Sequence, residues 1–440
     1  MSAIMGKNGG IYMKKARSAL CALCLALLVP LLIRAWRVLP VDSHPLVAEK
    51  YAGWSGVLRL WVFEGWESGA GSLSAWLNGC AARFEKRHPG VYVQPQAVDA
   101  GAIASFCDSG ILPPDMLLFP PGVLDSPEGL APLAVPDALR PALRHCGEWG
   151  ASSYAVPVAM GGYLWAWNAA LLDDVPGSWR EAGVAPAVME DDPFHHYGAA
   201  LLALCSGTYS EASPDAPAEE ALPGVDLGLA GGDTPAPAAT LAPDENALPC
   251  RLPDGFAFDP DAWKNFVNGE AAATPVTQRQ VRRLQALSER GAGPDWRLTS
   301  GGGGAFTDQL LCLAVVQKPD ADAQRALCEA FIQWLLSDDC QGALGEAGAF
   351  AVTDAASGLS PGDPLARMDA ALRSDGLAAP NCFDAKWPET VAEIVREFVA
   401  GEADPPALWR ALAARLTQNP NNNQKQAAIC PEIASPKGFI

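Results

Sequence analysis

The sequence predicts an α/β protein that folds into two lobes, on the basis of three observations. The chain has 440 residues, whereas a single hydrophobic core seldom grows past about 250 to 300 residues. Near its start, segments with strand character alternate with helical segments, which is typical of a parallel sheet. An apolar and aromatic run from Tyr154 to Trp167 resembles a buried strand, but Gly161 and Gly162 interrupt it. Since glycines let a backbone bend or approach a ligand closely, this run is expected to cross between the lobes.

Three strands and two helices are expected in the first part of the chain. Residues 57–63 alternate and are rich in Val, Leu, Trp and Phe, which predicts a strand. The helix that follows has one apolar stripe and ends at a His-Pro-Gly turn. The stripe consists of Leu73, Trp76, Leu77, Cys80 and Phe84. Two further strands are expected at 91–93 and 116–119, with a short helix at 100–109 between them. Because ligands lie beyond the carboxyl ends of parallel strands, the loops 64–71 and 120–126 are candidate ligand loops.

Further elements are expected after residue 255. Order is expected to return at 256–267, and a Gly-Glu-Ala-Ala sequence then leads into Thr277-Gln278. A glycine run at 301–304 precedes a strand at 305–317 and a helix with one apolar face. That face consists of Ala326, Leu327, Ala330, Phe331, Trp334 and Leu335. A phosphate-binding loop needs a Lys-Ser/Thr pair and a helix after its glycines, and both are missing here, so an interlobe turn is the favoured interpretation.

Several of these segments resemble one family. The run with Tyr154, Val156 and Pro157 is followed by Asn168, Leu171-Leu172 and a Pro-x-x-Trp turn that ends at Trp179. This order resembles the family 1 extracellular solute-binding proteins, the ligand-capturing components of ABC importers. Further matches follow in the expected order, so that the resemblance covers 57–416 apart from an insertion. These matches lie at 266–278, 300–339, 348–353 and 380–387.

The resemblance implies a two-lobed, periplasmic-binding-protein-like type II fold with three interlobe crossovers. Lobe 1 would comprise 57–158 and 305–348, and lobe 2 would comprise 159–304 and 349–416. A small ligand would be trapped in the interlobe cleft by hinge closure and delivered to an ABC permease. The protein would act as a monomer, without a cofactor and without covalent chemistry.

Candidate ligand-binding residues lie at strand ends and crossovers. Aromatic rings there would pack on sugar faces while polar side chains bind hydroxyl groups, which favours a carbohydrate. For each aromatic residue alone, packing in the core is an equal alternative. Peptides, polyamines and metal chelates also remain open as ligands. The candidates are Glu64, Trp66, Glu67, Phe119, Met160, Gly161, Tyr163, Gln278, Asn381 and Trp387.

The N-terminal region carries a membrane-targeting signal. An apolar run at 18–33 follows a basic segment, 1–17, and is flanked behind by Arg34 and Arg37. Because no small-x-small cleavage site follows closely, an uncleaved anchor is favoured, with 1–17 in the cytoplasm and the body on the extracellular face. An ordinary cleaved signal remains open. Between residues 181 and 250 there is no Lys or Arg, and 210–250 is expected to be a disordered acidic insertion. The tail, 417–440, is expected to fray.

Composition and motifs argue against other functions. The net charge of −19 repels nucleic acid. No nucleophile elbow, zinc protease motif or phosphate loop occurs, so no enzyme activity is expected. The acidic and histidine residues at 190–196 favour a helix start at Asp192-Pro193 over a metal site. Twelve cysteines permit disulfides but do not reveal their connectivity. Two alternatives remain: a membrane-anchored sensor without transport and an extracellular hydrolase.

Overall fold

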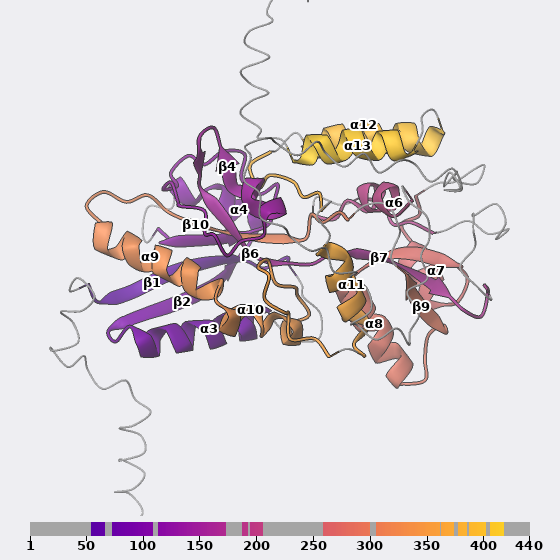
Figure 1. Cartoon of the computed structure of the whole chain (residues 1–440), viewed down its shortest axis with the longest axis horizontal. Helices are drawn as coiled ribbons and strands as arrows, with labels where there is room; N and C mark the ends of the chain where they lie inside the picture. The colour runs from indigo at the N-terminus through magenta and orange to yellow at the C-terminus, as the bar shows by residue number, and fades with distance from the viewer. Residues whose placement is uncertain are drawn as a thin grey trace, which may run out of the picture. The chain divides into compact units, whose positions relative to one another are not determined.

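The computed structural model describes residues 54–66, 73–108, 113–172, 187–191, 194–205, 258–299, 305–360, 362–373, 377–384, 387–401 and 405–417 (Figure 1). The predicted membrane segment, the acidic insertion, the glycine run and nearly all of the tail lie outside these residues. Within them, no helix combines the length and the apolar character that a membrane span requires. Contacts divide the described residues into two compact units, with Ala82–Val93 in one and Leu58–Ala81 and the described residues from Gln94 onwards in the other.

One mixed sheet contains the strands expected near the start of the chain. Its strand order is β2-β1-β3-β10-β6. Strand β1 is parallel to β3, with Leu60 opposite Met116, whereas β10 is antiparallel to both β3 and β6. All six residues of β6 and of β10 are buried, as expected for central strands that are covered on both faces. The bounds are Gly56–Phe63 for β1, Val91–Val98 for β2, Met116–Phe119 for β3, Ala155–Met160 for β6 and Leu310–Val315 for β10.

Helices α3 (Leu73–Arg87) and α9 (Asp322–Leu335) pack near this sheet. The predicted apolar stripe of α3 is buried, whereas in α9 the large residues of the predicted face are buried but Ala326 is exposed. The indole of Trp334 in α9 donates to the carbonyl of Cys80 in α3 at 2.9 Å, and the indole of Trp76 in α3 donates to the carbonyl of Cys340, just after α9, at 2.8 Å. Shorter elements complete this part of the fold. They are α4 (Ala100–Ala104), η2 (Phe106–Asp108), η3 (Pro141–Gly147), β4 (Glu148–Trp149), β5 (Ser152–Ser153), α10 (Asp338–Gln341) and η4 (Leu344–Ala347).

A second sheet, with order β8-β7-β9, is antiparallel throughout and has β7 at its centre. Trp165 of β7 lies opposite Pro275 on one side and Thr299 on the other. Figure 1 shows β6 continuing into β7. The strands are β7 (Tyr163–Asn168), β8 (Ala273–Thr277) and β9 (Trp296–Thr299), and the adjoining helices are α7 (Ala262–Val267), α8 (Gln278–Glu289) and α11 (Pro364–Leu372).

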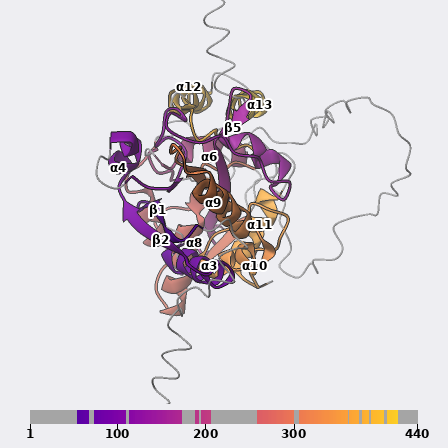
Figure 2. The same cartoon turned by 90° about the vertical axis from the view of Figure 1, so that its left-hand side faces the viewer.

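Three helices form a layer beside β7 and β8. All nine residues of α6 (Tyr197–Cys205) are buried, so this helix must be covered on every side. It packs against α12 (Trp387–Ala400) and α13 (Pro405–Leu416), which also lie side by side in both views (Figure 1, Figure 2). Trp387, Val391 and Leu412 join α6 in one hydrophobic cluster.

Two sequence expectations need correction. The strand expected at 305–317 covers only Leu310–Val315, because the polar side chains of Thr307, Asp308 and Gln309 make specific hydrogen bonds instead of continuing the ladder. The helix expected to start at Asp192-Pro193 begins at Tyr197. Asp192 and Pro193 themselves lie outside the described residues. The amide of Gly198 in the first turn of α6 instead donates to Asp191, at 2.7 Å.

Candidate functional site

Hydrogen bonds join the three segments that were expected to cross between lobes. Met160 and Phe350 exchange two main-chain hydrogen bonds, at 2.8 and 3.1 Å. The amide of Gly161 donates to the carbonyl of Gln309 at 2.6 Å, and the Thr307 hydroxyl donates to the carbonyl of Gly161 at 2.8 Å. Residues 160–161, 307–309 and 350 are therefore adjacent, although they are far apart in sequence.

The turn at Gly161-Gly162 lies so close to neighbouring side chains that a larger residue at either position would displace them. A Cβ atom at Gly161 would lie 2.1 Å from Nε2 of Gln278, and one at Gly162 would lie 2.4 Å from Cδ1 of Leu372. The amide of Gly162 donates to Oε1 of Gln278 at 3.0 Å. The glycines thus permit the close contact that the sequence indicated, and the contact brings Gln278 to the crossover.

Gln278 is the first residue of α8, and a capping box fixes the start of this helix. The Thr277 side chain accepts from the amide of Gln280, while the Gln280 side chain accepts from the amide of Thr277. Gln278 is fully buried, and its Nε2 donor has no partner among the described residues. A buried amide donor without a partner costs free energy, so it is a natural place for a ligand oxygen.

A buried carboxylate, Asp308, organises the polar side of the crossovers. It accepts hydrogen bonds from the Tyr163 hydroxyl at 2.6 Å, the His196 amide at 2.8 Å and the Gln309 side chain at 3.0 Å. Gln309 also donates to the carbonyl of Phe194 at 3.0 Å. Burial, and then the nearby Asp308, raise the pKa of Tyr163 well above its usual value. This network holds the second crossover against β7 and the segment before α6.

The loop after β1 reaches the same network. The ring of Phe63, the last residue of β1, lies 4.8 Å from the ring of Phe194. Glu64 and Trp66 follow directly; Glu64 is exposed, whereas Trp66 is buried and its indole donor has no partner among the described residues. Glu67, the third candidate in this loop, lies outside the described residues.

Two other candidates lie in a separate cluster. Phe119 is fully buried, and its ring centroid lies 6.2 Å from that of Phe383. The Asn381 side chain donates to the carbonyls of His145 and Glu148, both at 2.8 Å, and accepts from the amide of Phe383 at 2.9 Å. Both amide hydrogens of Asn381 are therefore already used within the protein.

Trp387 begins α12 and is buried in the hydrophobic cluster around α6. Its ring lies 4.1 Å from the ring of His196, whose amide binds Asp308. The sequence pattern indicated Trp387 as a site residue but not Asp308, Gln309 or His196. The polar triplet at 307–309, directly before an apolar strand, was the signal that could have revealed the first two.

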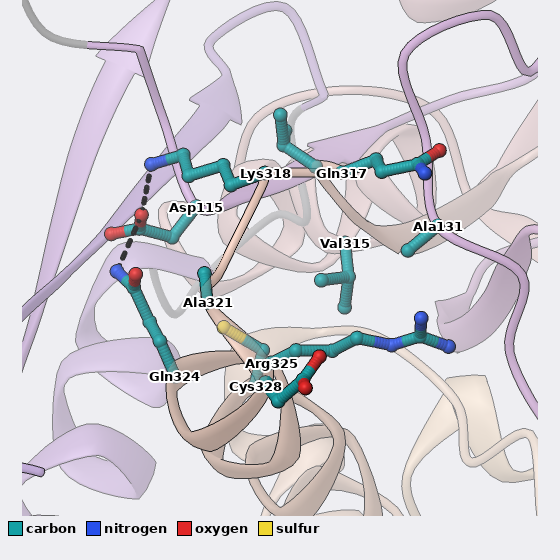
Figure 3. A pocket seen from close by; sticks show the side chains of 11 residues that line it. Asp115, Ala131, Val315, Gln317, Lys318, Ala321, Gln324, Arg325 and Cys328 are labelled. Carbon is teal, nitrogen blue, oxygen red and sulfur yellow. Dashed lines mark hydrogen bonds and ion pairs between the residues drawn. The ribbon is translucent and has the colours of Figure 1, made fainter.

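The described residues contain no group of three His, Cys, Asp or Glu side chains that could hold a metal ion. A polar pocket of about 130 Å³ lies between the end of β10 and the start of α9 (Figure 3). There, Lys318 and Gln324 both point at the carboxylate of Asp115 and bind it. None of the candidate residues lines this pocket, and its central carboxylate is already paired.

Comparisons with known proteins agree with this fold. A family profile described as bacterial extracellular solute-binding protein matches residues 80–361, more than half of the chain. Comparison with curated protein sequences finds no match.

Three solved structures share the fold at low sequence identity. The cyclic α-maltosyl-1,6-maltose binding protein of Arthrobacter globiformis is 14% identical with a TM-score of 0.51, covering 84% of this chain and 100% of its own. The sugar-binding protein MalE of Xanthomonas citri is 14% identical with a TM-score of 0.51, covering 85% and 99%. The maltodextrin binding protein MalE1 of L. casei BL23 is 15% identical with a TM-score of 0.50, covering 83% and 100%. The expected two-lobed α/β fold class is thereby confirmed, and the chain belongs to the bacterial extracellular solute-binding proteins.

Proposed function

We propose that the protein captures a carbohydrate at the crossovers and delivers it to an ABC permease. One observation carries the ligand site: the buried side-chain donor of Gln278 lacks a partner among the described residues, beside a glycine turn that allows close approach. Sugar hydroxyl oxygens are acceptors for such donors. The three similar structures named above are those of a cyclic α-maltosyl-1,6-maltose binding protein, a maltodextrin binding protein and a sugar-binding protein, which supports this ligand class.

The site would combine polar and aromatic groups. Gln278 would bind a hydroxyl oxygen, and the indole nitrogen of Trp66 would donate to another, while its ring offers an apolar face to the sugar. Glu64 is exposed on the same loop and would accept from hydroxyl groups. Met160, Gly161 and Tyr163 would form the wall at the crossover. The proposed set also includes Glu67 and three further lining residues, which are Phe119, Asn381 and Trp387.

The lobes would be the two parts predicted from the sequence, with 57–158 and 305–348 in the first and 159–304 and 349–416 in the second. Opening at the crossovers would admit the ligand, because Gln278 is fully buried in the present conformation. The N-terminal segment 18–33 would anchor the protein at the extracellular face of the membrane. The protein would act as a monomer and carry out no covalent chemistry.

A thermal-shift screen tests this proposal. Maltose, maltotriose, a cyclic maltodextrin and a set of short peptides would each be added to the full-length protein. A ligand present at one hundred times its Kd stabilises the folded state by about 2.7 kcal/mol, which raises the melting temperature by several degrees. We expect a sugar to produce this shift. Stabilisation by peptides alone would contradict the carbohydrate assignment.

A substitution at the unpartnered amide then tests the site. Gln278→Ala removes the donor, and we expect the affinity for the active sugar to fall by about 1 to 3 kcal/mol, or roughly 5- to 150-fold, in isothermal titration calorimetry. Gln333→Ala is the matched control, because Gln333 is exposed on α9 and belongs neither to the crossovers nor to the lining of the polar pocket. Equal affinities for the two variants would place the ligand elsewhere.

A further inference from the structure

Arg140 is a buried cation without an ion-pair partner among the described residues. Its side chain lies at the start of η3, and the residue is only 7% exposed. Burial, followed by repulsion from Arg373, lowers the pKa of Arg140 to about 10. Burying a charge in this way is costly unless the charge is hydrogen-bonded, and the guanidinium group of Arg140 has three acceptors.

The guanidinium group of Arg140 contacts three separate segments. It donates to the carbonyl of Ala351 at 2.7 Å, to the carbonyl of Leu372 at 3.0 Å and to the sulfur of Met160 at 3.1 Å. Its main-chain amide also donates to the carbonyl of Val352, at 3.1 Å. Met160 and Ala351 belong to two of the crossovers, and Leu372 is the last residue of α11. The positive charge of Arg140 also lies at the C-terminal end of α11, which is the negative end of that helix dipole.

The crossover at 348–353 is also held by hydrogen bonds that do not involve Arg140. The amide of Val352 donates to the Gln341 side chain, and the amide of Ala351 donates to the Ser357 hydroxyl, both at 2.9 Å. The distinctive contribution of Arg140 is therefore the link to α11. The nearby carboxylate of Asp369 is bound to Arg373 at 3.1 Å and takes no part in the link between Arg140 and α11.

A short chain of contacts leads from this link to the proposed ligand site. Leu372 packs so closely on Gly162 that a Cβ atom there would come within 2.4 Å of its side chain. Gly162 in turn donates its amide to Gln278, at 3.0 Å. The position of α11 is thus coupled to the residue that carries the unpartnered donor.

We propose that Arg140 is a positioning residue for ligand capture, which attaches the end of α11 to two crossovers and thereby favours the conformation in which Gln278 is buried. It touches no ligand. The proposal rests on the proposed function and on the lobe boundaries given there, with Arg140 in the first lobe and Leu372 in the second. Loss of the link shifts the equilibrium towards open conformations. The apparent affinity then falls in proportion to the fraction of the protein that remains in the binding-competent conformation.

Three substitutions of Arg140 separate positioning from stability. Arg140→Ala removes the link and leaves a cavity. Arg140→Met removes the charge and all hydrogen bonds but fills most of the space, and exchange of a buried charge for an apolar side chain is often neutral or stabilising. Arg140→Lys retains a cation that can bind carbonyl groups. Arg144→Ala is the control, because Arg144 is exposed in η3, four residues after Arg140, and among the described residues it donates to the nearby carbonyls of Leu139 and Asp137.

Small-angle X-ray scattering of the unliganded full-length variants is the first measurement. We expect Arg140→Met and Arg140→Ala to have a larger radius of gyration than the wild-type protein and Arg144→Ala, and Arg140→Lys to be intermediate. Titration of the same proteins with maltotriose is the second measurement. The Met and Ala variants should bind on the order of tenfold more weakly, with partial recovery in the Lys variant.

The outcomes separate this proposal from the proposed function. If Arg140→Met scatters and binds like the wild-type protein, Arg140 has only a packing role and the inference is overturned. If the wild-type protein binds no sugar, the carbohydrate proposal fails, yet the scattering of the unliganded variants still decides the role of Arg140. If the Met variant melts at the wild-type temperature but scatters as a larger particle, positioning is supported independently of stability.

Discussion

Removal of the Asp308 carboxylate should destabilise the protein strongly. Asp308 is only 3% exposed and accepts hydrogen bonds from Tyr163, His196 and Gln309. Asp308→Ala leaves these donors buried without their acceptor. Each such loss costs about 1 to 3 kcal/mol, and partial relaxation reduces the sum, so we expect the free energy of unfolding to fall by about 3 to 5 kcal/mol. Urea unfolding followed by circular dichroism measures this change.

Two comparisons make the Asp308 prediction specific. Asp137→Ala removes an exposed carboxylate from the same protein and should change the free energy of unfolding by less than about 0.5 kcal/mol. The double variant with Tyr163→Phe should lose less than the sum of its two single changes, because both groups belong to one hydrogen bond. A loss below about 1 kcal/mol for Asp308→Ala, or strict additivity with Tyr163→Phe, would refute the network.

Three further predictions concern Tyr163, Gly162 and Cys107. The pKa of Tyr163 is raised in the folded state. Its stabilising contribution is therefore complete below its usual pKa of about 10 and is lost at higher pH. In urea unfolding, the stability advantage of the wild-type protein over Tyr163→Phe should shrink above about pH 10. Gly162→Val should displace Leu372 and weaken sugar binding at least tenfold in calorimetry, whereas Gly362→Ala, at a position with open space around it, should leave binding unchanged. Among the eight described cysteines, iodoacetamide should modify Cys107 in the native protein at pH 8, because the other seven are buried. Burial raises the pKa of the Cys328 thiol, for example, to about 12. Mass spectrometry of the digested protein shows which cysteines are modified.

Periodicity and turn residues predicted much of the fold. The strands near residues 60, 92 and 117 and the apolar stripe of α3 occur as expected, because alternating and helical spacing report directly which faces are buried. Gly161 and Gly162 were identified correctly as a point of close approach, since no other residue type tolerates a neighbour within 2.4 Å of its Cβ position.

The composition of the site could be predicted only in part. Trp387 and Asn381 were chosen because they follow the expected crossovers, but the sequence does not distinguish an aromatic ring that faces a ligand from one that faces a helix. In the structure, Trp387 packs beside α6, and Asn381 binds the carbonyls of His145 and Glu148. Arg140 could not be found from the sequence, because its partners lie up to 232 residues away.

A crystal structure of the protein with a bound maltodextrin tests the central claim most directly. The account predicts a sugar oxygen within hydrogen-bonding distance, about 2.7 to 3.2 Å, of Nε2 of Gln278, with the ligand in contact with the turn at Gly161-Gly162. A sugar bound instead in the polar pocket between β10 and α9, with the amide of Gln278 still unpartnered, would contradict it.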